Sequence, residues 1–277
     1  MTVGIVTDST AYLPEAVTSR FGIEVVPVQV IVDGEAFDEL GGITVTEVAA
    51  ALRAGKSVTT SRPSPETFVA AYRRLRDQGC DSIVSVHLSS KLSGTYESAL
   101  LASKRMDFPV TVIDSHGIAM MMGFAIEAAA GLVDDDGSHE AVVELVKYRC
   151  DQAQVLFYVD TLEFLQRGGR ISALRSRVGS ALHVKPLLHM KDGEVESLEL
   201  VRTTAKAIPR LIDICAQRTA LNCEVAVHHV DASERAEEVA QLLCERLGRP
   251  AISVTEAGAV VGAHVGPGAI AVVISPQ

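Results

Sequence analysis

The sequence predicts a two-domain α/β protein whose N-terminal domain is a parallel sheet with helices on both faces. Through residues 1–152, short apolar runs alternate with polar loops and helical segments, which is the order of a parallel sheet and its crossover helices. The chain has 277 residues, 48% of them hydrophobic, enough to bury one large core or two medium ones. We expect a second α/β domain over residues 153–277.

Charge and composition narrow the possible partners. A net charge of −10, no Trp and only 4% aromatic residues argue against nucleic-acid binding, which needs a basic surface and stacking platforms. The five scattered cysteines form no C-x-x-C pair and are typical of reduced thiols in a cytoplasmic protein. The first residues become polar too early for a signal peptide, and no stretch of about 18 residues is continuously apolar, so we expect no membrane-spanning helix. We expect a cytoplasmic protein with at most transient membrane contact.

The first elements can be placed from their boundaries. Residues 3–6 form a buried strand that ends in the polar residues 7–10, and residues 23–32 form a second β run turned by Asp33-Gly34 as a hairpin. Thr44 and Glu47 have the spacing of a capping box and begin a helix through residue 52. The next helix begins with Ser64 as cap and Pro65 at its first position.

The stretch SSKLSGTYES at residues 89–98 is the strongest local signal of a site. It follows the apolar run 83–88, which is typical of a buried parallel strand, and precedes a helix. Free backbone N–H groups and hydroxyls at the positive end of a helix favour an anion. The alternative is that Ser93 or Thr95 only caps the helix, since both are preferred cap residues.

Other hydroxyl residues are expected near this stretch. The carboxyl ends of parallel strands meet at one edge of a sheet, and Thr10, Ser93 and Ser115 each follow a predicted strand. Thr60 lies in the segment 58–65, which two prolines hold extended. We expect all four residues on neighbouring loops of that edge.

The second half repeats strands and helices with a different connection pattern. It contains a strand at 155–159, a hairpin of 187–190 and 195–201, and strands at 223–229, 251–254 and 269–274. We place the domain boundary after residue 152, with the alternative that the last strand rejoins the first domain. Residues 262–268 are dense in glycine, which permits close approach of backbone to a ligand.

Motifs of self-sufficient catalysis are missing from the sequence. There is no G-x-x-x-x-G-K-[ST], H-E-x-x-H, G-x-S-x-G or protein-kinase signature, so an autonomous phosphotransferase is poorly supported. Ser93 with His264 would be the nucleophile and base of an acyl hydrolase, but Ser93 lacks a strained elbow and no third residue is indicated. We expect no catalytic residue, no metal and no cofactor.

Two further groups have both an ordinary and a functional interpretation. Met120, Met121 and Met122 are consecutive, so they cannot share one helix face; they either pack in the core or line an adaptable apolar cavity. Arg202 stands at a strand-to-helix junction, either as an exposed charge or as a contact to a partner. A local basic patch of Arg167, Arg170, Arg175 and Arg177 is a second candidate contact surface.

Taken together, the polar stretches resemble the DegV family in order and from end to end. No single stretch is decisive, but the set is specific. The stretches are TDST (7–10), TSRPSP (60–65), SKLSGTYES (90–98), VIDS (112–115), DTLEFL (160–165) with GGRI (168–171), KP (185–186), VRT (201–203) and GAHVGPG (262–268).

The resemblance implies a long-chain fatty acid buried between two α/β domains, with the C-terminal domain closing over the acyl chain. It implies the role of the fatty-acid-binding, non-catalytic subunit of bacterial fatty acid kinase. Such a subunit presents the carboxylate to a separate ATP-binding kinase subunit and carries away the acyl phosphate for phospholipid synthesis.

The resemblance also implies roles for particular residues. Thr60 and Ser93 would hydrogen-bond the carboxylate, His264 would lie beside the head group, and Arg202 would serve phosphotransfer with the kinase. The complete candidate sets are Thr60, Ser61, Ser93, Gly94 and His264 for the carboxylate, Met120, Met121 and Phe164 for the acyl chain, and Arg202 and Arg170 for the kinase. Arg62 stands where Gln is usual, and residues 120–122 are Met where Ser is more frequent, which bears on the choice of acyl chain.

The chemistry is consistent with a carrier. A saturated chain of about 16 carbons gains roughly 10 kcal/mol gross on burial, whereas each hydrogen bond to a charged acceptor contributes about 1.5–3 kcal/mol. The tail therefore dominates affinity and the hydroxyls orient the head group. The alternatives are the autonomous serine/histidine acyl hydrolase and an interaction module that the lipid only stabilises.

Overall fold

The computed structural model describes residues 2–171 and 185–277. Its contacts divide the chain into two compact units. The N-terminal unit comprises Met1–Gln29 and Ser61–Gln152, and the C-terminal unit comprises Val30–Thr60 and Ala153–Gln277.

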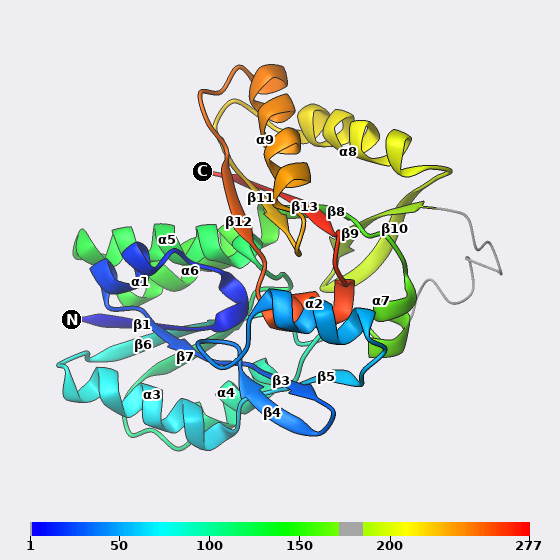
Figure 1. Ribbon diagram of the computed structural model, residues 1–277. Coiled ribbons are helices and arrows are strands. Elements are labelled where there is room, and N and C mark those ends of the chain that lie inside the picture. Colours follow the sequence, from blue (N-terminus) through cyan, green and yellow to red (C-terminus); the bar gives the residue numbers. More distant parts are fainter. Residues whose placement is uncertain (1, 172–184) are drawn as a thin grey trace. The chain divides into compact units, whose positions relative to one another are not determined.

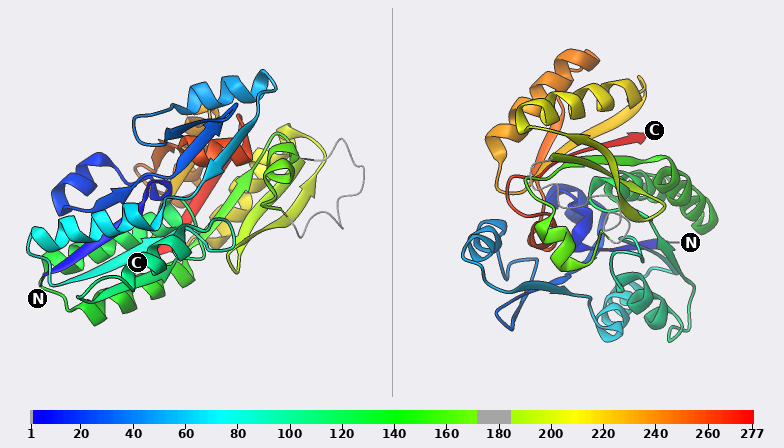
Figure 2. Two further views of the ribbon diagram at one scale, coloured as in Figure 1. Left: turned by 90° about the horizontal axis from the view of Figure 1, so that it is seen from below. Right: turned by 90° about the vertical axis from the view of Figure 1, so that its right-hand side faces the viewer.

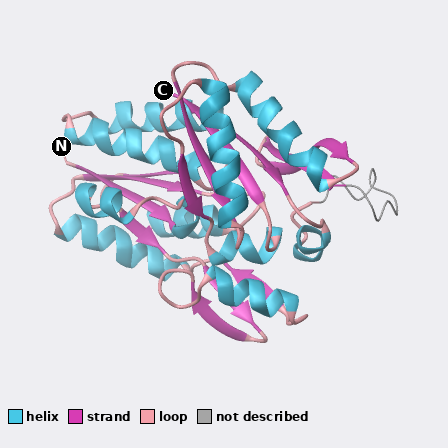
Figure 3. Ribbon diagram, turned by 45° about the horizontal axis from the view of Figure 1, so that its top comes forward, coloured by secondary structure: helices cyan, strands magenta, loops and turns pink. Residues whose placement is uncertain are grey.

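The N-terminal unit is built on a four-stranded parallel sheet in the order β2-β1-β6-β7 (Figure 1). Helices cover both of its faces, as the sequence predicts (Figure 3). Its elements are β1 (Val3–Asp8), the 3-10 turn η1 (Ser9–Ala11), α1 (Glu15–Phe21), β2 (Glu24–Val26), α3 (Pro65–Asp77), β6 (Ser82–His87), α4 (Thr95–Ser103), β7 (Val110–Asp114), α5 (Met120–Asp134) and α6 (His139–Gln152).

Alternation along the strands sends apolar side chains to both faces of this sheet. Val84 and Val86 of β6 pack with α5 and α6, whereas Ile83 packs with α3 and α4 on the opposite face. Because both faces are buried, the strands are mainly apolar, and the polar residues within them, such as Asp8, Ser85 and His87, are themselves buried. The loops after β1, β6 and β7 leave the same edge of the sheet.

The expected β run 23–32 is divided between two sheets. Its first part is β2 of the parallel sheet, and its second part is β3 (Gln29–Val32) of a separate three-stranded sheet, β4-β3-β5. Pro27 lies at the division and has no N–H to continue a ladder. The N–H of Val28 bonds instead to Ser9 Oγ at 3.0 Å. The hairpin predicted at Asp33-Gly34 is present, with positive φ at both residues.

The C-terminal unit contains that small sheet and a six-stranded sheet in the order β10-β9-β8-β13-β11-β12. All pairings in the larger sheet are antiparallel except β11 with β12. Its elements are β4 (Glu35–Asp38), α2 (Val45–Arg53), β5 (Val58–Ser61), β8 (Gln154–Tyr158), α7 (Glu163–Gly168), β9 (Lys185–Lys191), β10 (Glu194–Val201), α8 (Thr204–Arg218), β11 (Cys223–His229), α9 (Ser233–Leu247), β12 (Ser253–Glu256), α10 (Ala259–Val265) and β13 (Ile270–Pro276).

One face of the larger sheet forms the core of this unit with α8 and α9, which lie side by side (Figure 2). The predicted hairpin is β9–β10, turned at Asp192-Gly193 with positive φ at both positions. The alternative placement of the last strand is wrong. β13 pairs with β8 and β11 inside the C-terminal unit, where its apolar residues join the core.

Residues 30–60 are expected from the sequence in the N-terminal domain but group with the C-terminal unit. The capping box at Thr44 and Glu47 is present and begins α2, whose apolar face is buried. This helix packs against α10. A Cβ placed on Gly262 of α10 would lie 3.8 Å from Cγ1 of Val45 in α2. The local pattern of a hairpin and a helix contains no signal for this long-range packing.

Candidate ligand-binding site

The loop after β6 holds Ser93 by backbone hydrogen bonds. The carbonyl of Ser89 accepts the N–H groups of Leu92 at 2.9 Å and Ser93 at 3.1 Å. Ser89 Oγ accepts the N–H of Lys91 at 3.3 Å, and the carboxylate of Asp114 accepts that of Ser90. Ser93 is therefore presented by a short, internally bonded loop at the carboxyl end of the strand.

Ser93 is not the N-cap of α4, and neither is Thr95, because Gly94 occupies that position without a side-chain bond. The two hydroxyls instead pair with each other, with 2.9 Å between Ser93 Oγ and Thr95 Oγ1. Ser93 Oγ also accepts the N–H of Thr95 at 3.3 Å. Thr95 is fully buried and Ser93 is half-buried. When Thr95 donates to Ser93, the Ser93 proton is free for an external acceptor.

Gly94 lies directly beneath the exposed side chain of Arg62. A Cβ on Gly94 would stand 2.4 Å from Arg62 Nη1, so any larger residue would displace Arg62. Arg62 Nη1 donates to the Gly94 carbonyl at 3.5 Å, and the hydroxyl of the half-buried Ser61 donates to the Arg62 carbonyl at 3.4 Å. The exposed guanidinium thus places a positive charge next to the Gly94–Thr95 peptide.

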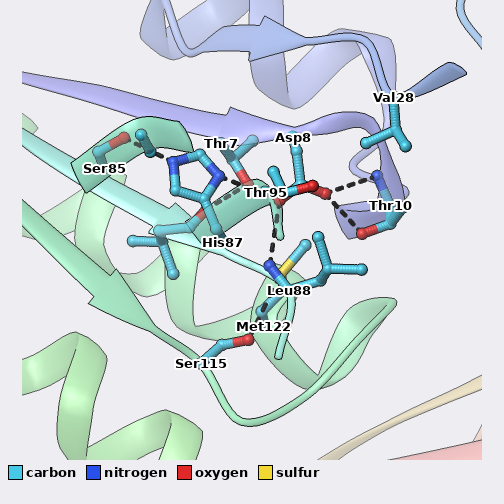
Figure 4. Close-up of polar contacts among 12 residues, drawn as sticks. Thr7, Asp8, Thr10, Val28, Ser85, His87, Leu88, Thr95, Ser115 and Met122 are labelled. Carbon is cyan, nitrogen blue, oxygen red and sulfur yellow. Dashed lines mark hydrogen bonds and ion pairs between the residues drawn. The ribbon is translucent and has the colours of Figure 1, made fainter. Parts of the chain in front are cut away.

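A buried polar cluster lies beneath the same edge of the sheet (Figure 4). The Asp8 carboxylate accepts hydrogen bonds from Thr10, His87 and the N–H of Leu88. The other ring nitrogen of His87 lies 2.7 Å from Ser85 Oγ, which lies 2.9 Å from the Tyr72 hydroxyl. Asp8, His87, Ser85 and Tyr72 have no solvent exposure, and burial raises the pKa of Tyr72.

In the C-terminal unit, Thr60 and His264 form the second candidate donor group. Thr60 Oγ1 on β5 lies 2.8 Å from His264 Nε2 at the end of α10. The other ring nitrogen, Nδ1, is buried and has no hydrogen-bond partner among the described residues. If Nε2–H donates to Thr60, the hydroxyl proton is free; if Thr60 donates, Nδ1–H is free. Either proton arrangement leaves one donor of this pair uncommitted.

His264 is neutral over the physiological range. Burial, with a smaller contribution from the positive charge of Arg170, lowers the pKa of His264 from 6.5 to about 4. Arg170 Nη1 donates to the carbonyl of Gly168 at 2.5 Å. Gly168 is the residue that packs against the His264 ring. The site therefore combines a neutral imidazole donor with a nearby cation, an arrangement that attracts an anion without forming an ion pair at the ring.

Two glycines allow α7 and the α10 segment to approach each other. A Cβ on Gly168 would lie 2.4 Å from His264 Nδ1, and one on Gly266 would lie 2.2 Å from the Phe164 ring. Gly266 also has a φ of +77°, which other residues rarely adopt. The glycine-rich segment thus approaches protein side chains closely and fixes the positions of His264 and Phe164.

The remaining candidate residues lie in different environments. Met120 and Met121 are buried in the first turn of α5, Phe164 is half-buried on α7, and Arg202 is exposed between β10 and α8. Met122 is fully buried in the core between the parallel sheet and α5. Arg175 and Arg177, two members of the expected basic patch, lie outside the described residues.

The expectation of one sheet edge for Thr10, Thr60, Ser93 and Ser115 is wrong for Thr60. Thr10, Ser93 and Ser115 do follow the carboxyl ends of β1, β6 and β7. Thr60 lies inside β5 of the small sheet and belongs to the C-terminal unit. Proline spacing marks residues 58–65 as extended but does not indicate which sheet they join.

Sequence reasoning missed the buried cluster of Asp8 and His87. Two signals were present: a carboxylate two residues after the apolar run 3–6, and a histidine inside the apolar run 83–88. Buried polar groups require partners, so each of these residues implied another. Only the fold shows that they bind each other, because they are 79 positions apart.

Within residues 2–171 and 185–277, no group of three or more His, Cys, Asp or Glu side chains is arranged to hold a metal ion. None of the helices in that part of the chain has the length and apolar character needed to cross a membrane.

The fold and the site define an α/β protein whose candidate ligand donors are hydroxyls and a neutral imidazole, a set that suits an anionic head group. The chain belongs to the DegV family. The family model, described as "Uncharacterised protein, DegV family", matches residues 2–277. A DegV domain-containing protein of Streptomyces coelicolor is 46% identical over 277 residues, which cover 99% of each chain.

Solved structures of the family have the same fold. One is described as fatty acid binding of a DegV family protein from Thermus thermophilus; it is 33% identical, covers 100% of both chains and has a TM-score of 0.93. Another is DegV, a fatty acid binding protein from Bacillus subtilis, 32% identical over 100% of both chains with a TM-score of 0.90.

Proposed function

We propose that this protein binds a long-chain fatty acid. The observation that carries the proposal is its similarity, over the whole chain, to the fatty-acid-binding DegV proteins of Thermus thermophilus and Bacillus subtilis. Within the chain, the uncommitted donors of the Ser93–Thr95 and Thr60–His264 pairs support it. A carboxylate accepts hydrogen bonds from such neutral donors.

The head group is assigned to Ser61, Ser93 and Gly94, which belong to the N-terminal unit, and to Thr60 and His264, which belong to the C-terminal unit. Neutral donors orient a carboxylate without neutralising it, and this leaves an oxygen able to react. Met120, Met121 and Phe164 are assigned to the acyl chain, whose burial supplies roughly 10 kcal/mol gross for about 16 carbons. Affinity in this proposal comes mainly from the tail and orientation mainly from the hydroxyls.

The finer role we propose is that of a cytoplasmic carrier subunit of a bacterial fatty acid kinase. A separate ATP-binding subunit would supply the phosphoryl group: a carboxylate oxygen bonds to the γ-phosphorus while the bond from that phosphorus to ADP breaks. The acyl phosphate then stays with the carrier and leaves for phospholipid synthesis. Arg202, which is exposed, and Arg170 are assigned to the contact with the kinase.

The test of fatty-acid binding is native mass spectrometry of the protein purified from a bacterial host. We expect a mass increment of one long-chain acid, which organic extraction then identifies. A protein that is empty, and that stays empty after incubation with hexadecanoic acid, would refute the proposal.

The kinase role is tested by phosphorylation of bound hexadecanoic acid with ATP and a DegV-cognate kinase. Arg202→Ala is expected to reduce the rate at least tenfold while lipid binding is retained. Arg73→Ala, which removes another exposed arginine, on α3, serves as the matched control. Equal phosphorylation rates for the two variants would contradict the carrier assignment and would favour a lipid that only stabilises the fold.

The alternative of an autonomous acyl hydrolase has a direct test. The protein alone is incubated with hexadecanoyl esters, and release of the alcohol is followed. The carrier proposal expects no turnover, and turnover lost in Ser93→Ala would favour the hydrolase.

A further inference from the structure

Asp8 is a fully buried carboxylate that receives four hydrogen bonds (Figure 4). Its Oδ1 accepts from the Thr10 N–H at 3.1 Å and the Thr10 hydroxyl at 2.5 Å. Its Oδ2 accepts from the Leu88 N–H at 3.0 Å and lies 3.0 Å from His87 Nδ1. A buried carboxylate is tolerated only with such partners, so this geometry is strongly constrained.

These bonds join the ends of two neighbouring strands. Thr10 belongs to the turn after β1, and Leu88 is the first residue after β6. The next residue, Ser89, supplies the carbonyl that accepts the N–H of Ser93. One bonded path therefore runs from Asp8 through Leu88 and Ser89 to the Ser93 hydroxyl.

The turn around Asp8 also fixes two other loops. The carbonyl of Thr10 accepts the N–H of Ala119 at 2.9 Å, directly before α5, and Ser9 Oγ accepts the N–H of Val28 after β2. Ala119 has φ 57°, an uncommon conformation for a residue with a side chain. Such backbone persists only where the surroundings impose it, and the turn is one of those constraints.

His87 extends the same cluster away from the loop. Its ring packs edge-on against Phe68 at 4.9 Å, and its Nε2 contacts Ser85, which contacts Tyr72 on α3. The cluster thus has a loop end at Asp8 and a core end at Tyr72. A substitution at either end is expected to lower the stability of the fold, but only one at the loop end is expected to change the position of Ser93.

We propose that Asp8 is a positioning residue for the ligand head group: it holds the loop 89–94 so that the Ser93 hydroxyl meets the carboxylate. The inference rests on the proposed fatty-acid binding. Asn at position 8 has the same shape but one acceptor oxygen and an NH₂ group that donates. Whichever way the amide is turned, two of the four groups that donate to Asp8 then face the NH₂ group, so the bonding that joins the Thr10 turn to the Leu88 end of the loop is weakened.

The experiment compares two ligands with the same tail. Dissociation constants are measured for hexadecanoic acid and hexadecan-1-ol by displacement of a fluorescent lipid. The ratio of the two constants compares the carboxylate with a hydroxyl head group, because burial of the tail cancels. Asp8→Asn is expected to reduce the wild-type preference for the acid about tenfold, the effect of losing one charge-assisted hydrogen bond.

Tyr72→Phe is the matched control at the core end of the cluster. It removes one buried hydroxyl and is expected to lower the melting temperature while leaving the acid-to-alcohol ratio within about twofold. If Asp8→Asn does not fold, Thr10→Val removes one donor to Asp8 with little change of shape, and we expect a drop of about threefold.

The outcomes separate the two proposals. A wild-type protein that binds neither ligand refutes fatty-acid binding itself. A wild-type protein that prefers the acid, with an unchanged ratio in folded Asp8→Asn, overturns only the positioning role. An equal loss of ratio in Tyr72→Phe would show a general structural effect and also overturn it.

Discussion

Two histidines with few solvent contacts show how differently this molecule uses polar groups. His87 in the N-terminal unit has a partner at each ring nitrogen, Asp8 and Ser85. His264 in the C-terminal unit has Thr60 at one nitrogen and no partner at the other among the described residues. A completed cluster stabilises a fold, whereas an incomplete one retains hydrogen-bonding capacity for a ligand. The predictions below follow from this difference.

The largest expected effect is on stability at His87. His87→Ala leaves the Asp8 carboxylate without one of its donors and opens a cavity beside Phe68, so we expect a loss of about 3–5 kcal/mol in the free energy of unfolding. His264→Ala is expected to cost less than about 1 kcal/mol, because one ring nitrogen is already unpartnered. Urea unfolding of both variants decides the matter, and equal losses would contradict the contrast.

Acidification is expected to weaken the protein through its buried neutral histidines. Burial lowers the pKa of His228 and of His264 from 6.5 to about 4. Because the folded-state pKa is below the unfolded one, the unfolded chain takes up these protons first. Stability contributed by the neutral form is therefore complete above pH 6.5 and is lost as the pH falls toward 4.

The size of this pH effect is roughly 3 kcal/mol for the fully buried His228. His264→Gln removes one of the two titrating groups and is expected to flatten the loss between pH 6.5 and 4.5. The check is the free energy of unfolding against pH for the wild type and the variant. Parallel curves would show that His264 titrates normally in the folded protein.

The incomplete pair is expected to respond mainly in ligand affinity. Thr60→Val removes the hydroxyl without changing the side-chain shape, and we expect hexadecanoic acid to bind about tenfold more weakly. The melting temperature should stay within about 2 °C, since Thr60 is half-buried and its partner is already incompletely bonded. A large thermal loss without an affinity change would assign Thr60 a structural role.

The smallest expected effect concerns Arg62. Its guanidinium is exposed beside Gly94, so its attraction for a carboxylate is screened by solvent. Arg62→Gln is expected to weaken acid binding about twofold at 20 mM salt and less at 200 mM. A loss as large as that of Thr60→Val would make Arg62 a principal head-group ligand.

Elements with local signals were predictable in both units. In the N-terminal unit, mainly apolar runs mark β1 and β6, and in the C-terminal unit Asp33-Gly34 and Asp192-Gly193 turn hairpins where the sequence indicates. Residues 30–60 were misassigned because α2 packs against α10, which lies more than 200 positions further along the chain. Local pattern contains no information on such pairings.

The site was predictable only in part for the same reason. The hydroxyl loop at Ser93 was evident from the strand–loop–helix order, and His264 and Thr60 came from family resemblance. Their mutual contact, and that of Asp8 with His87, depends on the tertiary fold. Gly168 illustrates this further, since nothing local indicates that its missing Cβ makes room for His264.

The most direct test of the central claim is ¹³C NMR of hexadecanoic acid labelled at its carboxyl carbon and bound to the protein. Hydrogen bonds from neutral donors stabilise the carboxylate, so we expect one sharp bound resonance that remains ionised to lower pH than the free acid. In Ser93→Ala and Thr60→Val that resonance should move toward the free shift. A bound resonance indifferent to both substitutions, or no bound resonance at all, would contradict the account.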